Sequence, residues 1–201
     1  MPDLALAIYL AFFAVAFGWR MWLQYRRTRD TGFRGFSSGT AVIDVLGSLC
    51  LLLAATLPAA AALAGRFSLA PAFAGVNTVS ANRAGLALAS LGFILVVVAQ
   101  LQMRDSWRVG VDRRETTALV TAGLFDVMRN PIYTGSFLAI LGVFLMVPNA
   151  LSALALILIV PGLEIQVRRV EEPYLLRTHG DSYRAYARRV GRFVPWLGRL
   201  A

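Results

Sequence analysis

Long apolar blocks dominate this chain, and they constrain its fold more than any other feature. Five of them are separated by polar stretches, at residues 4–23, 41–63, 85–103, 132–147 and 150–167. Each is near the ~20 residues that a helix needs to cross ~30 Å of hydrocarbon, although the fourth is short. Hydrophobic residues make up 58% of the positions and charged residues only 15%, whereas soluble domains carry about a quarter charged residues. The sequence therefore predicts an all-α integral membrane protein with about five transmembrane helices.

The arginines predict how these helices are oriented. All 20 basic residues are arginine, and only Arg66 and Arg83 fall between the second and third blocks; the others follow the first, third or fifth block. Because positive charge accumulates on the cytoplasmic side of a membrane, we expect the N-terminus outside and the C-terminus inside. A four-span arrangement would place the last arginine-rich stretch outside. The net charge of +9 is then explained by the membrane and its anionic headgroups, and we expect no nucleic-acid partner.

The blocks also predict one compact unit. Residues 1–103 would supply three N-terminal helices, and residues 104–201 a core made of a helical hairpin and a cytoplasmic C-terminal segment. Pro148 and Asn149 separate the last two blocks and favour a tight turn. No basic residue precedes the first block, which predicts a retained helix rather than a cleaved signal peptide. Gly85 and Ala89 are spaced to let another helix approach closely.

A polar motif opens the fourth block. Pro131 suits the first turn of a helix, and Asn130 is the expected cap. The helix N-terminus and the adjacent Arg129 could together hold an anion, with Tyr133 in the first turn and Gly135 allowing close approach. The alternative is a capped helix with an arginine and a tyrosine at the membrane interface.

Carboxylates follow the fifth block. Glu171 and Glu172 are adjacent, and Arg168 precedes them by three and four residues, so helical ion pairs could explain them. Alternatively, they bind a cation or sugar hydroxyls. Glu164 shares a helical face with Arg168 and Glu171, and an ionisable residue at that depth is a functional candidate.

The final polar stretch is amphipathic. Its apolar and aromatic residues recur near helical spacing, and its arginines are four residues apart on another face. The first set is Tyr183, Tyr186, Val190 and Phe193, and the second is Arg184, Arg188 and Arg192. We expect a helix on the inner leaflet, with its arginines toward lipid phosphates and its tyrosines facing inward. His179 is the single histidine, so a general base would be sought there or among the glutamates. No metal-ligand spacing, phosphate-binding glycine loop or Ser/His/Asp set occurs in the sequence.

The order of these motifs resembles the isoprenylcysteine carboxyl methyltransferase family, which overlaps with the phospholipid N-methyltransferases. The similarity runs from Trp107 to Pro195. It comprises a Gly-Leu-Phe turn, Arg-Asn-Pro-x-Tyr-x-Gly, an apolar hairpin, Glu-Glu-x-x-Leu, and Gly-x-x-Tyr-x-x-Tyr before a proline. Two departures are Asn130, where many members have histidine, and His179, where many have phenylalanine.

The resemblance implies transfer of a methyl group from S-adenosylmethionine to an amphiphilic acceptor, such as a lipid, an isoprenoid or a prenylcysteine. Carboxyl O-methylation is favoured over N- or S-methylation, in a pocket that faces the cytoplasm from the cell membrane and receives the acceptor from the lipid. The matching cofactor positions are Gly123, Leu124, Arg129, Asn130, Pro131, Tyr133, Glu171, Glu172, Tyr183 and Tyr186.

The chemistry of these residues agrees with that assignment. Glutamates suit the cofactor's ammonium or hydroxyls, Arg129 its carboxylate, and tyrosines its adenine or sulfonium. A carboxylate acceptor needs no base at neutral pH and could be held by Arg168 or Arg169, whereas an amine or thiol would need Glu171 or Glu172. Arg168, Glu171 and Glu172 are therefore the catalytic candidates.

Two other functions remain open on the sequence. Sterol C14 reductases share a similar C-terminal membrane fold and use NADPH, but they have about twice as many spans. A non-catalytic membrane scaffold or lipid-binding module is the second, although it gives little reason to keep costly glutamates at the membrane edge. The sequence identifies neither the acceptor nor the oligomeric state.

Overall fold

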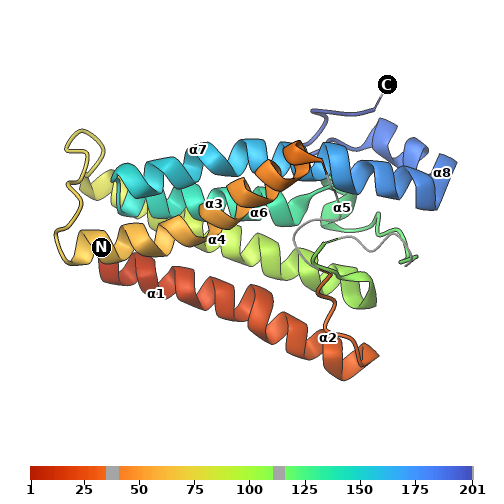
Figure 1. Ribbon diagram of the computed structural model, residues 1–201, viewed down its shortest axis with the longest axis horizontal. Coiled ribbons are helices and arrows are strands. Elements are labelled where there is room, and N and C mark those ends of the chain that lie inside the picture. The colour runs from red at the N-terminus through yellow and green to blue at the C-terminus, as the bar shows by residue number, and fades with distance from the viewer. Residues whose placement is uncertain (35–40, 111–115, 201) are drawn as a thin grey trace.

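A computed structural model describes residues 1–34, 41–110 and 116–200 of the chain. Two of the arginines counted above, Arg113 and Arg114, lie outside the described residues. Within those ranges the regular elements are helices, joined by two isolated β-bridges. Figure 1 shows the long helices side by side in an elongated bundle, with the two termini at opposite ends. The predicted all-helical class is confirmed.

Each predicted apolar block forms a helix. The first is continuous through a π-helical turn, and the last continues through a second π-helical turn into the C-terminal region. In chain order the elements are α1 (Pro2–Phe13), η1 (Ala14–Trp19), α2 (Arg20–Thr28), α3 (Val42–Arg66), α4 (Val79–Met103), η2 (Arg104–Ser106), α5 (Leu124–Val127), α6 (Pro131–Met146), α7 (Ala150–Ile165), η3 (Gln166–Glu171) and α8 (Glu172–Arg189).

Four continuous helices of the described chain are long and apolar enough to cross a membrane. They are Pro2–Thr28, Val42–Arg66, Val79–Ser106 and Ala150–Arg189. The remaining apolar helix, α6, has 16 residues and so spans about 24 Å at 1.5 Å per residue. This matches the short fourth block of the sequence.

Small residues allow α4 and α6 to pack backbone against backbone. A Cβ added at Gly92 would lie 2.4 Å from the carbonyl oxygen of Gly135, and one at Gly85 would lie 2.6 Å from that of Gly142. Only glycine fits such an approach, because any side chain would overlap the facing helix. The close helix contact predicted around Gly85 and Ala89 is confirmed.

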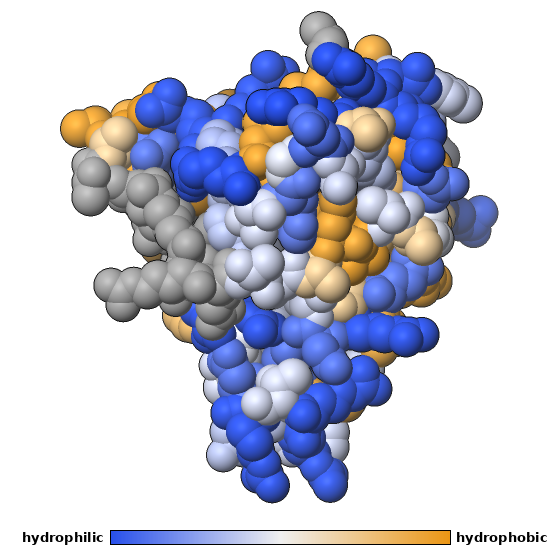
Figure 2. Space-filling view, turned by 90° about the vertical axis from the view of Figure 1, so that its right-hand side faces the viewer, coloured by the Kyte–Doolittle hydropathy of each residue, from blue (hydrophilic) through white to orange (hydrophobic). Residues whose placement is uncertain are grey.

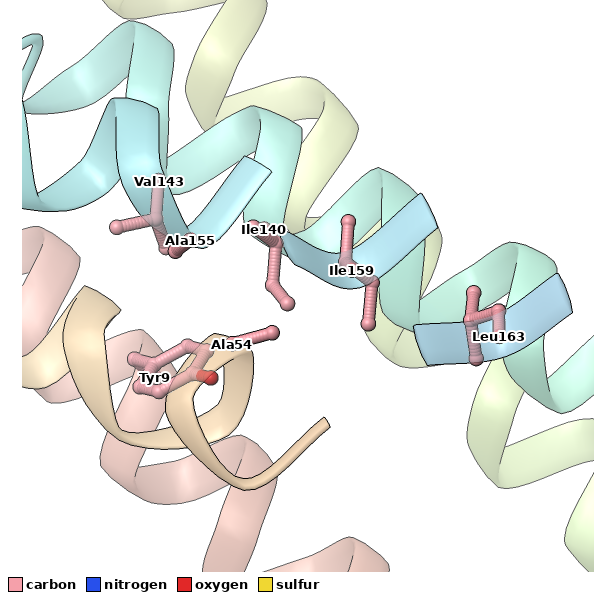
Figure 3. Close-up of a cluster of buried hydrophobic side chains, with 7 residues drawn as sticks. All are labelled: Tyr9, Ala54, Ile140, Val143, Ala155, Ile159 and Leu163. Atoms are coloured by element: carbon pink, nitrogen blue, oxygen red, sulfur yellow. The ribbon is translucent and has the colours of Figure 1, made fainter. Parts of the chain in front are cut away.

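An apolar cluster joins four helices at the centre of the bundle. Tyr9 comes from α1, Ala54 from α3, and the other members from α6 and α7. In Figure 3 the side chains of Ile140 and Ile159 point toward Tyr9 and Ala54. The Tyr9 hydroxyl also donates to the Ala55 carbonyl of α3 at 3.1 Å, so the polar end of this buried side chain has a hydrogen-bond partner.

The turn between α6 and α7 is as tight as predicted. The Asn149 side chain accepts hydrogen bonds from the Leu151 and Ser152 amides, and the Ser152 hydroxyl accepts from the Asn149 amide in return. The Asn149 side-chain nitrogen donates to the Ala61 carbonyl at 3.0 Å, which ties the turn to α3. This reciprocal capping starts α7 immediately after the turn.

The C-terminal helix is bent, and it ends earlier than predicted. α8 bends at Gly180, whose φ of 52° favours glycine, and it folds back toward the bundle (Figure 1). The helix ends at Arg189, so the expectation that it continues to Phe193 is wrong. Tyr183 and Tyr186 face inward as predicted, and they are covered by other parts of the chain: Leu119, Leu175, Leu176 and Leu200.

One end of the bundle carries most of the charge. At this end the segments that follow the first, third and fifth apolar blocks (α2, η2 and α8) lie near the start of α6 (Figure 1). Figure 2 shows this end covered largely by hydrophilic side chains, with smaller hydrophobic areas between them. We call it the arginine-rich end.

Candidate functional site

A cavity of about 590 Å³ lies inside the described part of the molecule and reaches the arginine-rich end. Its inner part is lined by apolar side chains of the α1–η1 helix, α3, α6 and α7, among them Phe12, Phe17, Leu51 and Ile159. Its other part is lined by polar groups from the start of α6, from η3 and from α8. The cavity therefore joins an apolar compartment to a polar one.

Glu171 is the carboxylate of the polar compartment. It lines the cavity and accepts hydrogen bonds from the Tyr133 hydroxyl and, at 3.2 Å, from the Gln166 side-chain nitrogen. No cationic side chain of the described ranges forms a salt bridge with it. Such a negative group at the edge of a low-dielectric cavity attracts a cationic ligand.

The π-helical turn η3 places these groups. It spans Gln166–Glu171 and inserts one residue into the helical repeat, and such turns are frequent at functional sites. Gln166 is buried and faces the cavity, whereas Arg168 and Arg169 point outward and are exposed. The π turn brings Gln166 and Glu171, which are five residues apart, to the same side of the helix, where they form a hydrogen bond of 3.2 Å.

Aromatic rings form the opposite side of the polar compartment. Tyr183 and Tyr186 both line it, with their ring centroids 6.1 Å apart at an angle of 61°. The Tyr186 hydroxyl donates to the Phe125 carbonyl at 2.6 Å, which fixes its ring. Ring faces of this kind can hold an aromatic or a cationic ligand.

Glu172 lies behind the cavity, in a buried cluster with two arginines. Its carboxylate accepts from Arg129 Nη2 at 2.6 Å, from Arg192 Nε at 2.8 Å, and from Arg192 Nη2 at 3.0 Å. The hydrogen bonds to Glu172 raise the pKa of Arg192 above its ordinary value. Two positive charges on one carboxylate make this a strongly bound group, with little capacity left for a ligand.

Arg129 also fixes the segment that follows α8. Its Nη atoms donate to the carbonyls of Ala187, Val190 and Gly198, at 2.9, 2.6 and 3.1 Å. Its backbone amide donates to the Gly191 carbonyl at 2.8 Å. The guanidinium therefore holds the C-terminal segment against the start of α6, and only its Nε lacks a partner among the described residues.

The expected cap of α6 is absent. Asn130 occupies the N-cap position but makes no side-chain capping bond; its side-chain nitrogen donates instead to the Arg192 carbonyl at 3.1 Å. The prediction that Asn130 caps the helix is therefore wrong, because the C-terminal segment takes up that side chain. Thr134 likewise donates to the Phe193 carbonyl at 2.6 Å.

Most of the residues singled out from the sequence meet at this cavity. Those that line it are Arg129, Asn130, Pro131, Tyr133, Glu171, Tyr183 and Tyr186. Gly123 and Leu124 do not line it; the Leu124 amide donates to Gln102 Oε1 at 2.9 Å. Arg168 is exposed and pairs with Glu164, and Arg169 pairs with Asp44 at 3.0 Å, so the structure brings neither arginine to the cavity.

Three residues of the site were not identified from the sequence. Arg192 was placed on the lipid-facing side, and Gln166 and Trp107 were not considered as cavity residues. Gln166 could have been noticed as an amide next to the end of an apolar block, where a polar side chain needs a partner. No local pattern marks Arg192 or Trp107, because their roles depend on contacts with distant segments.

Comparisons with known proteins identify the family of the chain. Residues 81–182, just over half of the chain, match the family model described as phospholipid methyltransferase. Protein-S-isoprenylcysteine O-methyltransferase B of Arabidopsis thaliana is 33% identical over 115 residues, covering 56% of this chain and 58% of that protein. The corresponding Schizosaccharomyces pombe enzyme is 32% identical over 109 residues, covering 53% and 46%.

A solved structure shares the fold. The eukaryotic intramembrane Ras methyltransferase ICMT (isoprenylcysteine carboxyl methyltransferase) superposes with a TM-score of 0.64 at 19% identity, covering 96% of this chain and 66% of that one. The matched part spans about half the length of the two curated relatives. The family model begins within α4 and ends within α8, so it includes Tyr133 and Glu171 of the polar compartment and stops before Tyr183. The chain therefore belongs to the phospholipid methyltransferase family.

Proposed function

We propose that this protein is an integral membrane methyltransferase that uses S-adenosylmethionine and acts on an amphiphilic, prenylcysteine-like acceptor. The observation that carries the proposal is the continuity between the polar and apolar compartments of one cavity. A charged, water-soluble donor fits the first, and a hydrocarbon chain fits the second. The curated relatives, which act on isoprenylcysteine by their names, support the same acceptor class.

The donor site follows from the groups that line the polar compartment. The Glu171 carboxylate suits the ammonium or sulfonium of the donor, and the Tyr183 and Tyr186 rings suit its adenine or its sulfonium. When bound, the donor supplies an electrophilic methyl group. The residues of this chain would hold the donor and the acceptor in line and exclude water from between them.

In this proposal Arg129 and Glu172 have a structural role in place of the direct ligand role predicted for them from the sequence. Their charges neutralise each other and hold the C-terminal segment in place. In this proposal they shape the donor site, and Glu171 makes the charged contact. Glu171 would also be the base for an amine or thiol acceptor, whereas a carboxylate acceptor needs none.

The proposed topology has five spans, with the N-terminus outside and the site at the cytoplasmic face. The positive-inside rule supports it, because the two described arginines away from the arginine-rich end are Arg66, the last residue of α3, and Arg83, in the first turns of α4. Residues 1–103 and 104–201 form one unit in this proposal, since helices of both parts line the cavity. The arginine face of α8 would lie toward anionic headgroups at that surface.

Isothermal titration calorimetry of the purified protein tests the donor. We expect S-adenosylmethionine and S-adenosylhomocysteine to bind, and NADPH not to bind. Binding of NADPH alone would favour the reductase, and binding of none of the three at millimolar concentration would favour the scaffold. Radiolabelled methyl transfer to a short prenylcysteine then tests the acceptor.

Glu171→Gln tests the charged contact. We expect this variant to weaken S-adenosylhomocysteine binding by about tenfold or more, since a charged hydrogen bond contributes about 1.5–3 kcal/mol. The matched control is Glu164→Gln, which removes the same charge about two turns earlier and outside the cavity. Equal affinities of the two variants would contradict the assignment of Glu171.

A further inference from the structure

Arg20 is a buried arginine at the inner end of the first long helix, outside the site described above. It is 1% exposed. Its guanidinium donates to Gln24 Oε1 at 2.9 Å and to the Arg104 carbonyl, and it stacks over the Trp107 ring at 4.7 Å from the centroid. Among the residues that the structure describes, none supplies it with a carboxylate partner in a salt bridge.

Neighbouring groups reinforce this contact. The Gln24 side chain, which is fully buried, donates to the Asp105 carbonyl at 2.9 Å. The Val109 amide donates to the Gly32 carbonyl at 2.8 Å. A Cβ added at Gly32 would lie 3.2 Å from the Trp107 ring. Residues of the first long helix and of the loop after it therefore contact residues 104–109 through hydrogen bonds and the stack on Trp107, all from one side.

The other side of that segment faces the cavity. Met103 and residues 106–110 line it, and Trp107 is only 2% exposed. The ring of Trp107 is thus held between Arg20 and the cavity. Residues 104–110 follow the end of α4 at the arginine-rich end. They therefore form part of the cavity wall at the end where the donor is proposed to bind.

The energetics argue against an incidental contact. Burying a guanidinium without a carboxylate is costly, and a cation–π stack offsets only part of that cost. A neutral residue would pack in this place at lower cost. A chain gains from keeping such a group where a neighbouring element must be held in one geometry.

We infer that Arg20 is a positioning residue for the methyl donor and acts through Trp107. The inference rests on the proposed function. In it, the first helix does more than anchor the chain: its inner end fixes one wall of the donor site, so that Trp107 keeps the shape of the pocket when the donor is absent. Preorganisation of this kind raises affinity because less ordering accompanies binding.

A double-mutant cycle tests the inference, with affinity for S-adenosylhomocysteine and melting temperature measured in detergent for each variant. We expect Arg20→Gln to raise the dissociation constant by about tenfold, which corresponds to about 1.4 kcal/mol. Arg20→Lys should fall between the wild type and Arg20→Gln. In the Trp107→Leu background, Arg20→Gln should change the affinity by less than about twofold, because the group it acts through is gone.

The control is Arg26→Gln on the same helix. Arg26 stacks over Trp22 at 5.1 Å, but both residues are exposed and neither lines the cavity. It should leave the affinity unchanged.

Several outcomes would overturn the inference. These are an unchanged affinity in Arg20→Gln, effects of Arg20→Gln and Trp107→Leu that simply multiply, or a loss of affinity no larger than that of Arg26→Gln. If Arg20→Gln does not fold, the lysine variant decides, and an unchanged affinity there contradicts the inference. A wild type that binds no S-adenosylhomocysteine refutes the proposed function itself.

Discussion

Glu172→Gln should destabilise the protein, although the change removes a single charge and almost no volume. The carboxylate receives three hydrogen bonds from Arg129 and Arg192, and all three side chains are buried. An amide would keep one acceptor oxygen and turn an NH₂ group toward a guanidinium, so two donors would face each other. Two buried positive charges would also lose their counter-charge.

The expected cost follows from these contacts. Removing one partner of a buried ion pair costs about 3–5 kcal/mol. For a chain of this length, 1 kcal/mol corresponds to about 2–4 °C, so we expect the melting temperature in detergent to fall by roughly 10 °C. The loss should begin in the C-terminal segment, because residues 187–198 provide most of the other partners of Arg129.

Differential scanning fluorimetry and limited trypsin digestion measure both effects. Cleavage after Arg192 should become faster in the variant, since that side chain is released. The matched control is Asp181→Asn, which breaks an exposed pair with Arg184 on the same helix and should shift stability by less than about 1 kcal/mol. A Glu172→Gln melting temperature within about 2 °C of the wild type would refute the structural role of this cluster.

Three further predictions concern other parts of the molecule. Gly92→Ala should abolish the monodisperse peak in size-exclusion chromatography, because its Cβ would lie 2.4 Å from the α6 backbone. The control Gly75→Ala, whose Cβ would have no atom within 4 Å, should keep that peak, and equal profiles would contradict the backbone packing of α4 on α6. Tyr133→Phe should weaken S-adenosylhomocysteine binding by about five- to tenfold through the lost bond to Glu171, with little change in melting temperature; unaltered affinity would count against that bond. Arg184→Glu should reduce association with vesicles containing anionic lipid, by about 1 kcal/mol per basic charge lost, and unchanged lipid dependence would contradict the placement of the α8 arginines.

The apolar blocks predicted the helices well because their signal is local. Length and hydropathy located five helices, and Pro148 with Asn149 located the turn between α6 and α7. Small residues such as Gly85 indicated close packing because only backbone fits there. None of these predictions required knowledge of which segments meet in space.

The site was predictable in its membership but not in the division of roles. The motif residues gather at one cavity, yet Glu171 faces it while Glu172 faces the C-terminal segment. The directions of the Glu171 and Glu172 side chains depend on the π-helical turn η3, and no residue pattern in the sequence indicates an extra residue in a helical repeat. Arg168 illustrates the same difficulty, since regular helical spacing placed it beside Glu171 and the turn directs it outward.

The attachment of the C-terminal segment has a consequence for biosynthesis. Residues 191–198 leave the ribosome after every group that they contact in α6 and at the start of α8. During translation the hairpin can insert into the bilayer before Arg192 and the Gly198 carbonyl are available to Glu172 and Arg129. The buried cluster around Arg129 and Glu172 is complete only when this last segment docks. A nascent protein stalled before Gly191 should therefore already sit in the membrane, with its C-terminal region not yet held in place.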